Sequence, residues 1–207
     1  MLKVGIDFDN TIISYDELFY EVAVSSKLAN PSVRPFKNDI RAYVRSLDNG
    51  EIAWQKLQLE VYGRYIDKAP VSPMFEEFLD YCKDANVEVF VVSHKTQFAA
   101  QDDNREYDLI AHAKEWLLKN KIVSDAGPIK KENIFFEPTR SKKIGRIADI
   151  GCDIFIDDLY EVLQDDSFPV ASAPWLFDPN KIFHEDAGLT RIISWQEAKV
   201  KLSHCLN

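Results

Sequence analysis

The chain contains 207 residues, of which 46% are hydrophobic, so it is long enough to bury one substantial core and a small accessory domain. A net charge of −9 and a pI near 5.0 disfavour nucleic acid and anionic membranes as partners, because the field of the whole molecule repels polyanions. The three cysteines lack the spacing of a zinc site or a disulfide framework, which favours a reducing cytoplasm. No apolar run is long enough to span a bilayer, and the N-terminus has none of the features of a signal peptide.

A short apolar run at residues 2–6 leads into two carboxylates, Asp7 and Asp9, and then into Thr11. The run is typical of a buried parallel strand, and ligands of open α/β sheets bind at the carboxyl ends of such strands. Two carboxylates this close repel each other unless a cation lies between them, and oxygen ligands suit Mg2+. Because strand side chains alternate, we expect Asp7 and Asp9 to face the same side. The alternative is that residues 9–11 form only a turn and a cap for the next helix.

The segment 14–72 contains no convincing strand and is predicted to be helical. The expected helices are residues 15–28, 36–47 and 52–66. The segment is rich in aromatic residues at helical spacing, most of which we expect to pack in a core. One or two of them, near Tyr15 or Trp54, are expected to face a substrate.

After this segment, apolar strands and amphipathic helices alternate, as in an α/β fold with a mainly parallel sheet. The expected strands are residues 87–92, 134–136, 152–156 and 191–193, with a further strand within residues 169–177. The expected helices are residues 73–86, 109–120, 141–150 and 195–206. Between them, the polar loop 97–107 directly follows a strand and its polar end, where loops commonly carry specificity, and a solvated connection is equally consistent with its composition.

Polar residues follow these strands in a consistent order along the chain. The strand 87–92 ends in Ser93, the amphipathic helix begins with Lys142 and Lys143, and the strand 152–156 ends in Asp157 and its neighbour Asp158. The order Asp-x-Asp, Ser, Lys, Asp-Asp resembles the four motifs of the haloacid dehalogenase superfamily phosphatases. In a response-regulator receiver domain the lysine would come last instead.

The resemblance covers residues 1–12 and about 75–180, and it implies an architecture for the whole chain. The expected fold is α/β, with a three-layer Rossmann-like core, a mainly parallel sheet and a small α-helical cap inserted after the first motif. The expected domains are a core of residues 1–13 and 73–207 and a cap of residues 14–72. Asn10 stands where the family usually has glycine, which is tolerable because Asn adopts unusual backbone angles more readily than most residues.

The resemblance also implies a role for each motif residue. Asp7 would be the nucleophile that forms an aspartyl-phosphate, and Asp9 would protonate the leaving group and then activate water. Ser93 would donate a hydrogen bond to the transferring phosphoryl group. Lys143 would offset the charge of the nucleophile and the phosphate, with Lys142 as the alternative.

The remaining candidates concern the metal and the substrate. The expected ligands of Mg2+ are the aspartates of the first and fourth motifs, namely Asp7, Asp9, Asp157 and Asp158. The sequence leaves open which member of the fourth-motif pair contacts the metal directly. The expected phosphate- or substrate-binding residues are Thr11, Ser93, His94, Lys95 and Lys142. For Lys95, a solvated surface position is equally consistent with the sequence.

Three functional hypotheses follow from these residues. The first is a cytoplasmic Mg2+-dependent phosphomonoester hydrolase, monomeric or homodimeric, that acts on a small phosphorylated metabolite because its cap excludes macromolecules. The second is a phosphotransferase or phosphomutase that shields the same aspartyl-phosphate from water. The third is a non-catalytic binding protein, against which the intact motif residues argue. The second aspartate of the first motif favours phosphoryl chemistry, since superfamily members that cleave carbon–halogen bonds lack it.

Overall fold

The computed structural model describes residues 1–183 and 189–206, which form two compact units. The core unit comprises Met1–Ile12, Val71–Lys95 and the chain from Asn120 onward. The second unit comprises Ile13–Pro70 and Thr96–Lys119. Among the described residues, no helix combines the length and the apolar composition needed to cross a membrane.

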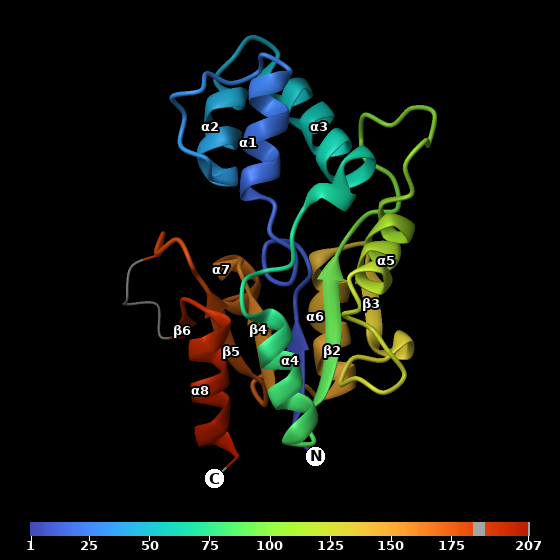
Figure 1. Ribbon diagram of the computed structural model, residues 1–207, viewed down its shortest axis with the longest axis vertical. Helices are drawn as coiled ribbons and strands as arrows, with labels where there is room; N and C mark the ends of the chain where they lie inside the picture. The colour runs from blue at the N-terminus through green and yellow to red at the C-terminus, as the bar shows by residue number, and fades with distance from the viewer. Residues whose placement is uncertain (184–188, 207) are drawn as a thin grey trace. The chain divides into compact units, whose positions relative to one another are not determined.

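The core unit contains a parallel sheet whose strands run in the order β3-β2-β1-β4-β5-β6 (Figure 1). The strands are β1 (Lys3–Ile6), β2 (Glu88–His94), β3 (Ile134–Glu137), β4 (Ile154–Asp157), β5 (Ala173–Phe177) and β6 (Thr190–Ile192). Every neighbouring pair among them is parallel. The predicted α/β fold is therefore confirmed. The strand expected within residues 169–177 is β5, and residues 169–170 precede it outside the strand.

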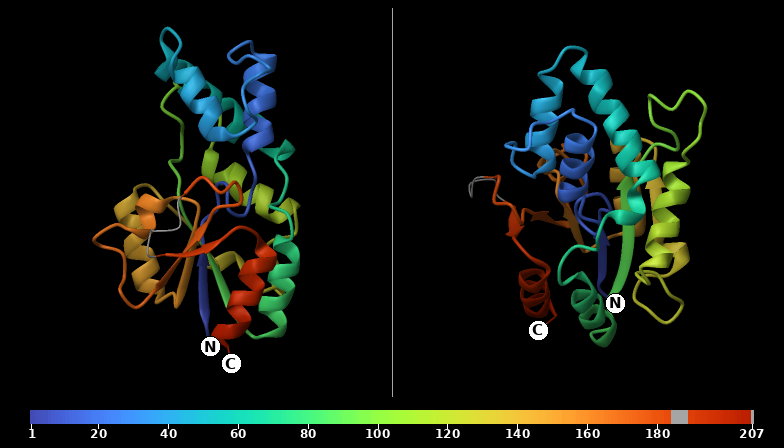
Figure 2. Two further views of the ribbon diagram at one scale, coloured as in Figure 1. Left: turned by 90° about the vertical axis from the view of Figure 1, so that its left-hand side faces the viewer. Right: turned by 45° about the horizontal axis from the view of Figure 1, so that its top comes forward.

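Helices cover both faces of this sheet. Figure 2 shows α6 (Arg140–Ile150) and α7 (Tyr160–Leu163) on one face, and α4 (Phe75–Asp84) and α8 (Trp195–Cys205) on the other. The sequence defines the ends of α6 clearly. The Thr139 hydroxyl accepts a hydrogen bond from the Lys142 amide at the N-terminus, and Gly151 adopts a left-handed conformation (φ 67°) after the last turn.

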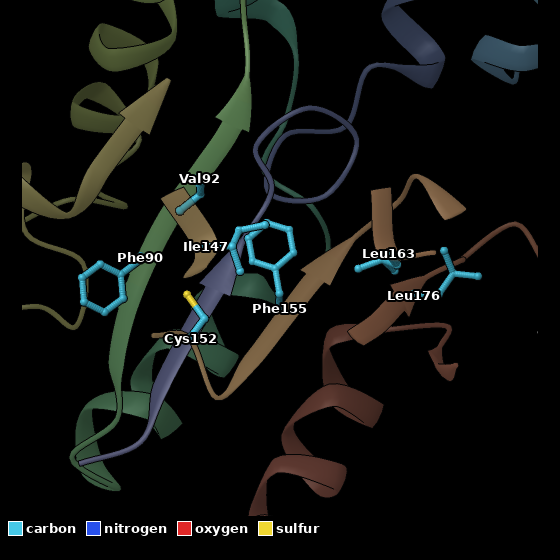
Figure 3. Close-up of a cluster of buried hydrophobic side chains, with 7 residues drawn as sticks. All are labelled: Phe90, Val92, Ile147, Cys152, Phe155, Leu163 and Leu176. Atoms are coloured by element: carbon cyan, nitrogen blue, oxygen red, sulfur yellow. The ribbon is translucent and has the colours of Figure 1, made fainter. Parts of the chain in front are cut away.

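A buried apolar cluster joins the sheet to α6 and α7 (Figure 3). Its members are Phe90, Val92, Ile147, Cys152, Phe155, Leu163 and Leu176. Gly5 in β1 makes room for one of them, because a Cβ atom at this position would lie 2.5 Å from Cδ2 of Phe155. A larger residue here would clash with this ring and push β1 away from the cluster.

The register brings the carboxyl ends of three central strands together. Ile6 of β1 lies opposite Val91 of β2 on one side and Ile156 of β4 on the other. The Asp7 amide then donates to the Ile156 carbonyl at 2.9 Å, which extends the pairing by one residue beyond β1. The polar residues that follow these strands therefore share one edge of the sheet, as open parallel sheets require of a ligand site.

The second unit consists of helices packed around aromatic side chains. Its helices are α1 (Asp16–Ser25), α2 (Lys37–Arg45), α3 (Gly50–Leu59), the π-helical turn η1 (Glu60–Arg64), the 3₁₀ turn η2 (Ile66–Lys68) and α5 (Leu109–Lys119). Tyr15, Phe19 and Trp54 are buried, and Phe19 stacks on Trp54 with ring centroids 5.0 Å apart. Tyr15 and Trp54 are themselves buried, so their burial does not support a substrate contact by either of them, and the expectation for aromatic residues near them stays a prediction.

The third predicted helix of this unit, residues 52–66, is interrupted. The α-helix ends at Leu59 and continues as the wider turn η1. Gly63 within that turn lies against Tyr107, since a Cβ atom on Gly63 would be 2.8 Å from Cβ of Tyr107. Close packing against a distant segment of the chain therefore accompanies the change in helix type.

The boundary of the second unit differs from the expected cap, because residues 96–119 group with residues 13–70. The Trp116 indole N–H donates to the Ala69 carbonyl at 3.0 Å, and the Gln101 amide donates to the Gln55 side chain at 3.0 Å. Helix α5 thus packs on η1 and η2 of the same unit. Sequence periodicity identified this helix but contained no information on which unit it joins.

Candidate active site

The nucleophile candidate Asp7 directly follows β1, and Asp9 lies in the turn beyond it. β1 ends at Ile6, and the turn is closed by a hydrogen bond from the Ile12 amide to the Phe8 carbonyl at 3.1 Å. The alternation of strand side chains therefore does not extend to Asp9, contrary to the argument made from the sequence. Asn10 occupies the left-handed region (φ 56°), a conformation that Asn adopts more readily than most residues.

Lys143 connects the first and fourth motifs. Its Nζ lies 2.6 Å from Oδ1 of Asp7 and 2.6 Å from Oδ2 of Asp157, and all three side chains are buried. The Lys143 ammonium also lies 5.5 Å from the ring centroid of Phe155, a member of the apolar cluster. Helix α6 therefore projects its first-turn lysine into the space between the ends of β1 and β4.

Burial and the neighbouring charges together set the pKa values of Lys143 and Asp157. Burial alone would lower the pKa of Lys143, but the adjacent carboxylates of Asp157 and Asp7 outweigh it and hold the pKa above its ordinary value. Burial raises the pKa of Asp157 and the negative charge of Asp7 adds to this effect, while Lys143 opposes it. One ammonium thus serves two carboxylates, which leaves negative charge in a buried site.

A third carboxylate adds to that negative charge. Asp7, Asp157 and Asp158 each offer one oxygen, and these oxygens all lie within 4.8 Å of one another. Carboxylates this close to one another repel unless a cation lies between them. Carboxylate oxygens are also the ligands that Mg2+ prefers. The residues present therefore fit a bound Mg2+ ion.

Neighbouring groups orient the two fourth-motif aspartates. The Leu159 amide donates to Oδ1 of Asp157 at 3.0 Å, on the oxygen that does not contact Lys143. The Asn10 side-chain amide donates to Oδ2 of Asp158 at 3.5 Å. The asparagine that departs from the expected glycine thus contacts a candidate metal ligand.

Asp9 does not belong to the three-carboxylate group, although the sequence analysis counted it among the metal ligands. Its two carboxylate oxygens instead accept hydrogen bonds from Nζ of Lys95, at 3.0 and 2.9 Å. Lys95 is 5% exposed, so the solvated position considered from the sequence does not describe it. Lys95, predicted as a phosphate- or substrate-binding residue, is paired with Asp9, the acid–base candidate.

The other predicted site residues divide into buried and exposed sets. Ser93 is buried at the end of β2, and Thr11 is buried with no hydrogen-bond partner for its hydroxyl among the described residues. His94 is exposed, with Nε2 3.2 Å from the Pro138 carbonyl oxygen. Lys142 is exposed on α6, so Lys143 is the lysine that contacts the carboxylates.

Comparison with known proteins identifies the fold. No protein-family model and no curated protein sequence matches this chain. Among solved structures, it is similar to a haloacid dehalogenase-like family hydrolase from Streptococcus pneumoniae, with a TM-score of 0.64, 11% identity and 98% of each chain covered. The chain has the haloacid dehalogenase-like fold.

Two further structures with the haloacid dehalogenase-like fold contain bound ions. A putative hydrolase from Bacillus subtilis, bound to magnesium, matches with a TM-score of 0.57 and 12% identity over all of this chain and 98% of its own. A hydrolase from Deinococcus radiodurans, with bound phosphate and sodium, matches with a TM-score of 0.56 and 12% identity over 98% of this chain and 95% of its own. At these identities the likeness establishes the haloacid dehalogenase-like fold alone.

Sequence reasoning missed two contacts within this fold. It did not foresee that Lys95 pairs with Asp9, or that Asn10 contacts Asp158. The sequence contained a signal for the contact between Lys95 and Asp9, since Lys95 directly follows β2 and Asp9 follows the neighbouring β1. Residues beyond the ends of adjacent parallel strands lie close together, but only the register shows which of them meet.

Proposed function

We propose that this chain is a Mg2+-dependent phosphomonoester hydrolase that acts on a small phosphorylated metabolite. The observation that carries the proposal is the buried contact of Lys143 with Asp7 and Asp157, beside the third carboxylate of Asp158. Buried charge is costly to maintain and is concentrated at functional sites. The haloacid dehalogenase-like fold and the motif order of the sequence support the same reaction class.

In this proposal Asp7 attacks the phosphorus atom of the ester. An Oδ–P bond forms to give an aspartyl-phosphate while the P–O bond to the leaving alcohol breaks. Lys143 offsets the charge of Asp7 while a phosphate approaches, which like-charge repulsion would otherwise oppose. Ser93, buried at the end of β2, is the candidate donor to an oxygen of the transferred phosphoryl group.

Asp9 supplies the proton transfers. In its acid form it donates a proton to the leaving oxygen, and as a carboxylate it then takes a proton from the water that hydrolyses the aspartyl-phosphate. Its carboxylate is 20% exposed, unlike that of Asp157, so water has access to it. The water oxygen bonds to phosphorus as the Oδ–P bond to Asp7 breaks, which releases inorganic phosphate and returns the Asp7 carboxylate. The proton gained from water restores the acid form of Asp9.

Asp7, Asp157 and Asp158 would hold Mg2+ in the proposed enzyme. The ion would supply positive charge opposite the oxygens of the transferring phosphoryl group. The magnesium bound to the Bacillus subtilis structure and the phosphate bound to the Deinococcus radiodurans structure support this expectation by analogy. The net charge of −9 favours a small substrate over a polyanion such as nucleic acid.

The decisive experiment measures phosphate release from a panel of phosphorylated metabolites, with Mg2+ and with EDTA. The test variant is Asp7→Asn, which keeps the shape of the side chain and removes the attacking charge. Asp149→Asn, an exposed aspartate of α6, is the matched control. We expect metal-dependent turnover in the wild type and the control, and a loss of at least about 10⁴-fold in Asp7→Asn.

The outcomes separate the competing functions. Release of phosphate to water supports the hydrolase, whereas transfer to an added acceptor without net release would indicate a phosphotransferase. Orthovanadate with Mg2+ should raise the melting temperature of the wild type, because it mimics the phosphoryl group and binds the folded state. Substantial turnover by a folded Asp7→Asn protein would exclude Asp7 as the nucleophile.

A further inference from the structure

Lys95 has unusual surroundings for a lysine at the end of a strand. It is 5% exposed, and its ammonium donates to both carboxylate oxygens of Asp9, at 2.9 and 3.0 Å. A lysine that captured part of a substrate would be expected to present its ammonium to solvent. Lys95 instead directs its charge at the residue to which the proposed function assigns the proton transfers.

The backbone holds Lys95 at this place. Its amide donates to the Glu137 carbonyl at 2.9 Å, which continues the β2–β3 pairing one residue past the end of β2. The Glu137 carboxylate is in turn bound by Nε of Arg146 on α6 at 2.8 Å. The Lys95 ammonium also lies 5.6 Å from the ring centroid of Phe8, the residue between Asp7 and Asp9. These contacts come from β3, from α6 and from the turn after β1.

The two buried lysines of the site contact different acids. Lys143 contacts Asp7 and Asp157, whereas the ion pair of Lys95 is with Asp9. An ammonium buried to this extent needs a charged partner, so it restrains that partner to the rotamer in which both are paired. The nucleophile Asp7 and the acid–base residue Asp9 are therefore paired with different lysines.

We propose that Lys95 is a positioning residue that holds the Asp9 side chain in the orientation from which its acid form donates a proton to the leaving group. The inference rests on the proposed phosphoester hydrolysis and adds a specific division of labour to it. Lys143 supports the attack on phosphorus, and Lys95 supports departure of the alcohol. Loss of Lys95 should therefore matter most when the leaving oxygen needs a proton.

The test compares two substrates whose leaving groups differ in how strongly they need a proton. p-Nitrophenyl phosphate releases a weakly basic phenolate that leaves without full protonation, whereas an alkyl ester such as glycerol phosphate releases a strongly basic alkoxide. The variant Lys95→Met removes the charge and keeps the length of the side chain. Lys201→Met is the matched control, because Lys201 forms an exposed pair with Glu197 in the same unit.

We expect Lys95→Met to lower kcat for the alkyl ester about 10- to 100-fold and kcat for p-nitrophenyl phosphate by about threefold or less. KM should change little for either substrate, since Lys95 does not bind the substrate in this proposal. Asp9→Asn should show the same selectivity more strongly, and adding Lys95→Met to Asp9→Asn should have little further effect. Lys201→Met should behave as the wild type with both substrates.

Other results would overturn the proposal. An equal loss of kcat for both esters would indicate a purely structural role, and a rise in KM for both would indicate that Lys95 binds the substrate anion. If Lys95→Met does not fold, Lys95→Arg and Lys95→Gln are compared instead. Lys95→Arg retains the charge, so it should keep a higher kcat for the alkyl ester than Lys95→Gln. If the wild type releases phosphate from neither ester and from no member of the metabolite panel, the proposed hydrolase function is wrong. The proposed role of Lys95 is then wrong as well.

Discussion

The core unit and the second unit bury their charged side chains in different ways. Among the described residues of the core unit, each buried charged side chain forms an ion pair at or near the carboxyl end of a strand. These side chains are Asp7, Lys95, Lys143, Asp157 and Asp178. In the described part of the second unit, Asp102 is the buried charged side chain, and its oxygens accept from the backbone amides of Glu106 and Tyr107.

The difference fits the proposed function, in which the core unit carries the reaction. A buried ion pair is weak evidence for stability, because desolvation offsets much of the Coulomb attraction. Charges kept in this way at one edge of a sheet are better explained by a reaction that needs them. In the second unit, Asp102 satisfies backbone amides in a loop, and the aromatic stack of Phe19 on Trp54 supplies apolar burial.

The largest effect should follow removal of the shared lysine of the core. Lys143→Met leaves Asp7 and Asp157 buried without a cation, so we expect a loss of about 3–5 kcal/mol in the free energy of unfolding, measured in urea with EDTA, together with loss of turnover. Lys119→Met breaks an exposed pair with Asp67 and should cost under about 1 kcal/mol. Equal losses of unfolding free energy in Lys143→Met and Lys119→Met would contradict the expected difference between buried and exposed ion pairs.

In the second unit, the largest effect should come from an apolar residue. Trp54→Ala removes a buried indole and should lower the free energy of unfolding by about 3–5 kcal/mol. Arg105→Ala, at an exposed position, should change it by about 0.5 kcal/mol or less. If Trp54 instead contacted a substrate, its truncation would alter relative kcat/KM among substrates with little loss of stability.

A smaller effect is expected at the buried carboxylate of the second unit. Asp102→Ala removes the acceptor of two backbone amides and should cost about 1–3 kcal/mol in urea unfolding. The neighbouring Asp103 is exposed, so Asp103→Ala provides a matched control that should be near neutral. Phosphatase activity toward p-nitrophenyl phosphate should be retained by Asp102→Ala at temperatures where the protein is folded, because the carboxylate acts on the loop and not in the reaction.

The mildest test needs no substitution and uses the thiols of the core unit. Burial raises the pKa of Cys82 and of Cys152 to about 12, whereas Cys205 is exposed. The unfolded chain ionises these thiols near pH 8.5. Their contribution to stability should therefore be complete below that pH and should fall as pH rises from there toward 12. Ellman's reagent at pH 8 should react with one thiol in the native protein and with three in denaturant, and rapid reaction of all three in the native state would contradict the burial.

Local pattern in the sequence was enough to predict the strands and the residues at their ends. Apolar runs predicted β1, β2, β3 and β4, and the polar residues after them include Asp7, which contacts Lys143 in the structure. A buried parallel strand leaves this signature because both of its faces are covered, so its polar residues can occur only where it ends. The α/β fold with a mainly parallel sheet followed from the same alternation of strands and helices.

The tertiary structure decided which of these residues meet. Asp9 and Lys95 are 86 positions apart, and their pairing depends on the register of β1 and β2 and on the turn that takes Asp9 out of the strand. The placement of residues 96–119 in the second unit depends on contacts such as that of Trp116 with Ala69. Periodicity indicates which face of a helix or strand is buried. The element against which that face packs depends on segments distant in the chain, so a local pattern does not determine it.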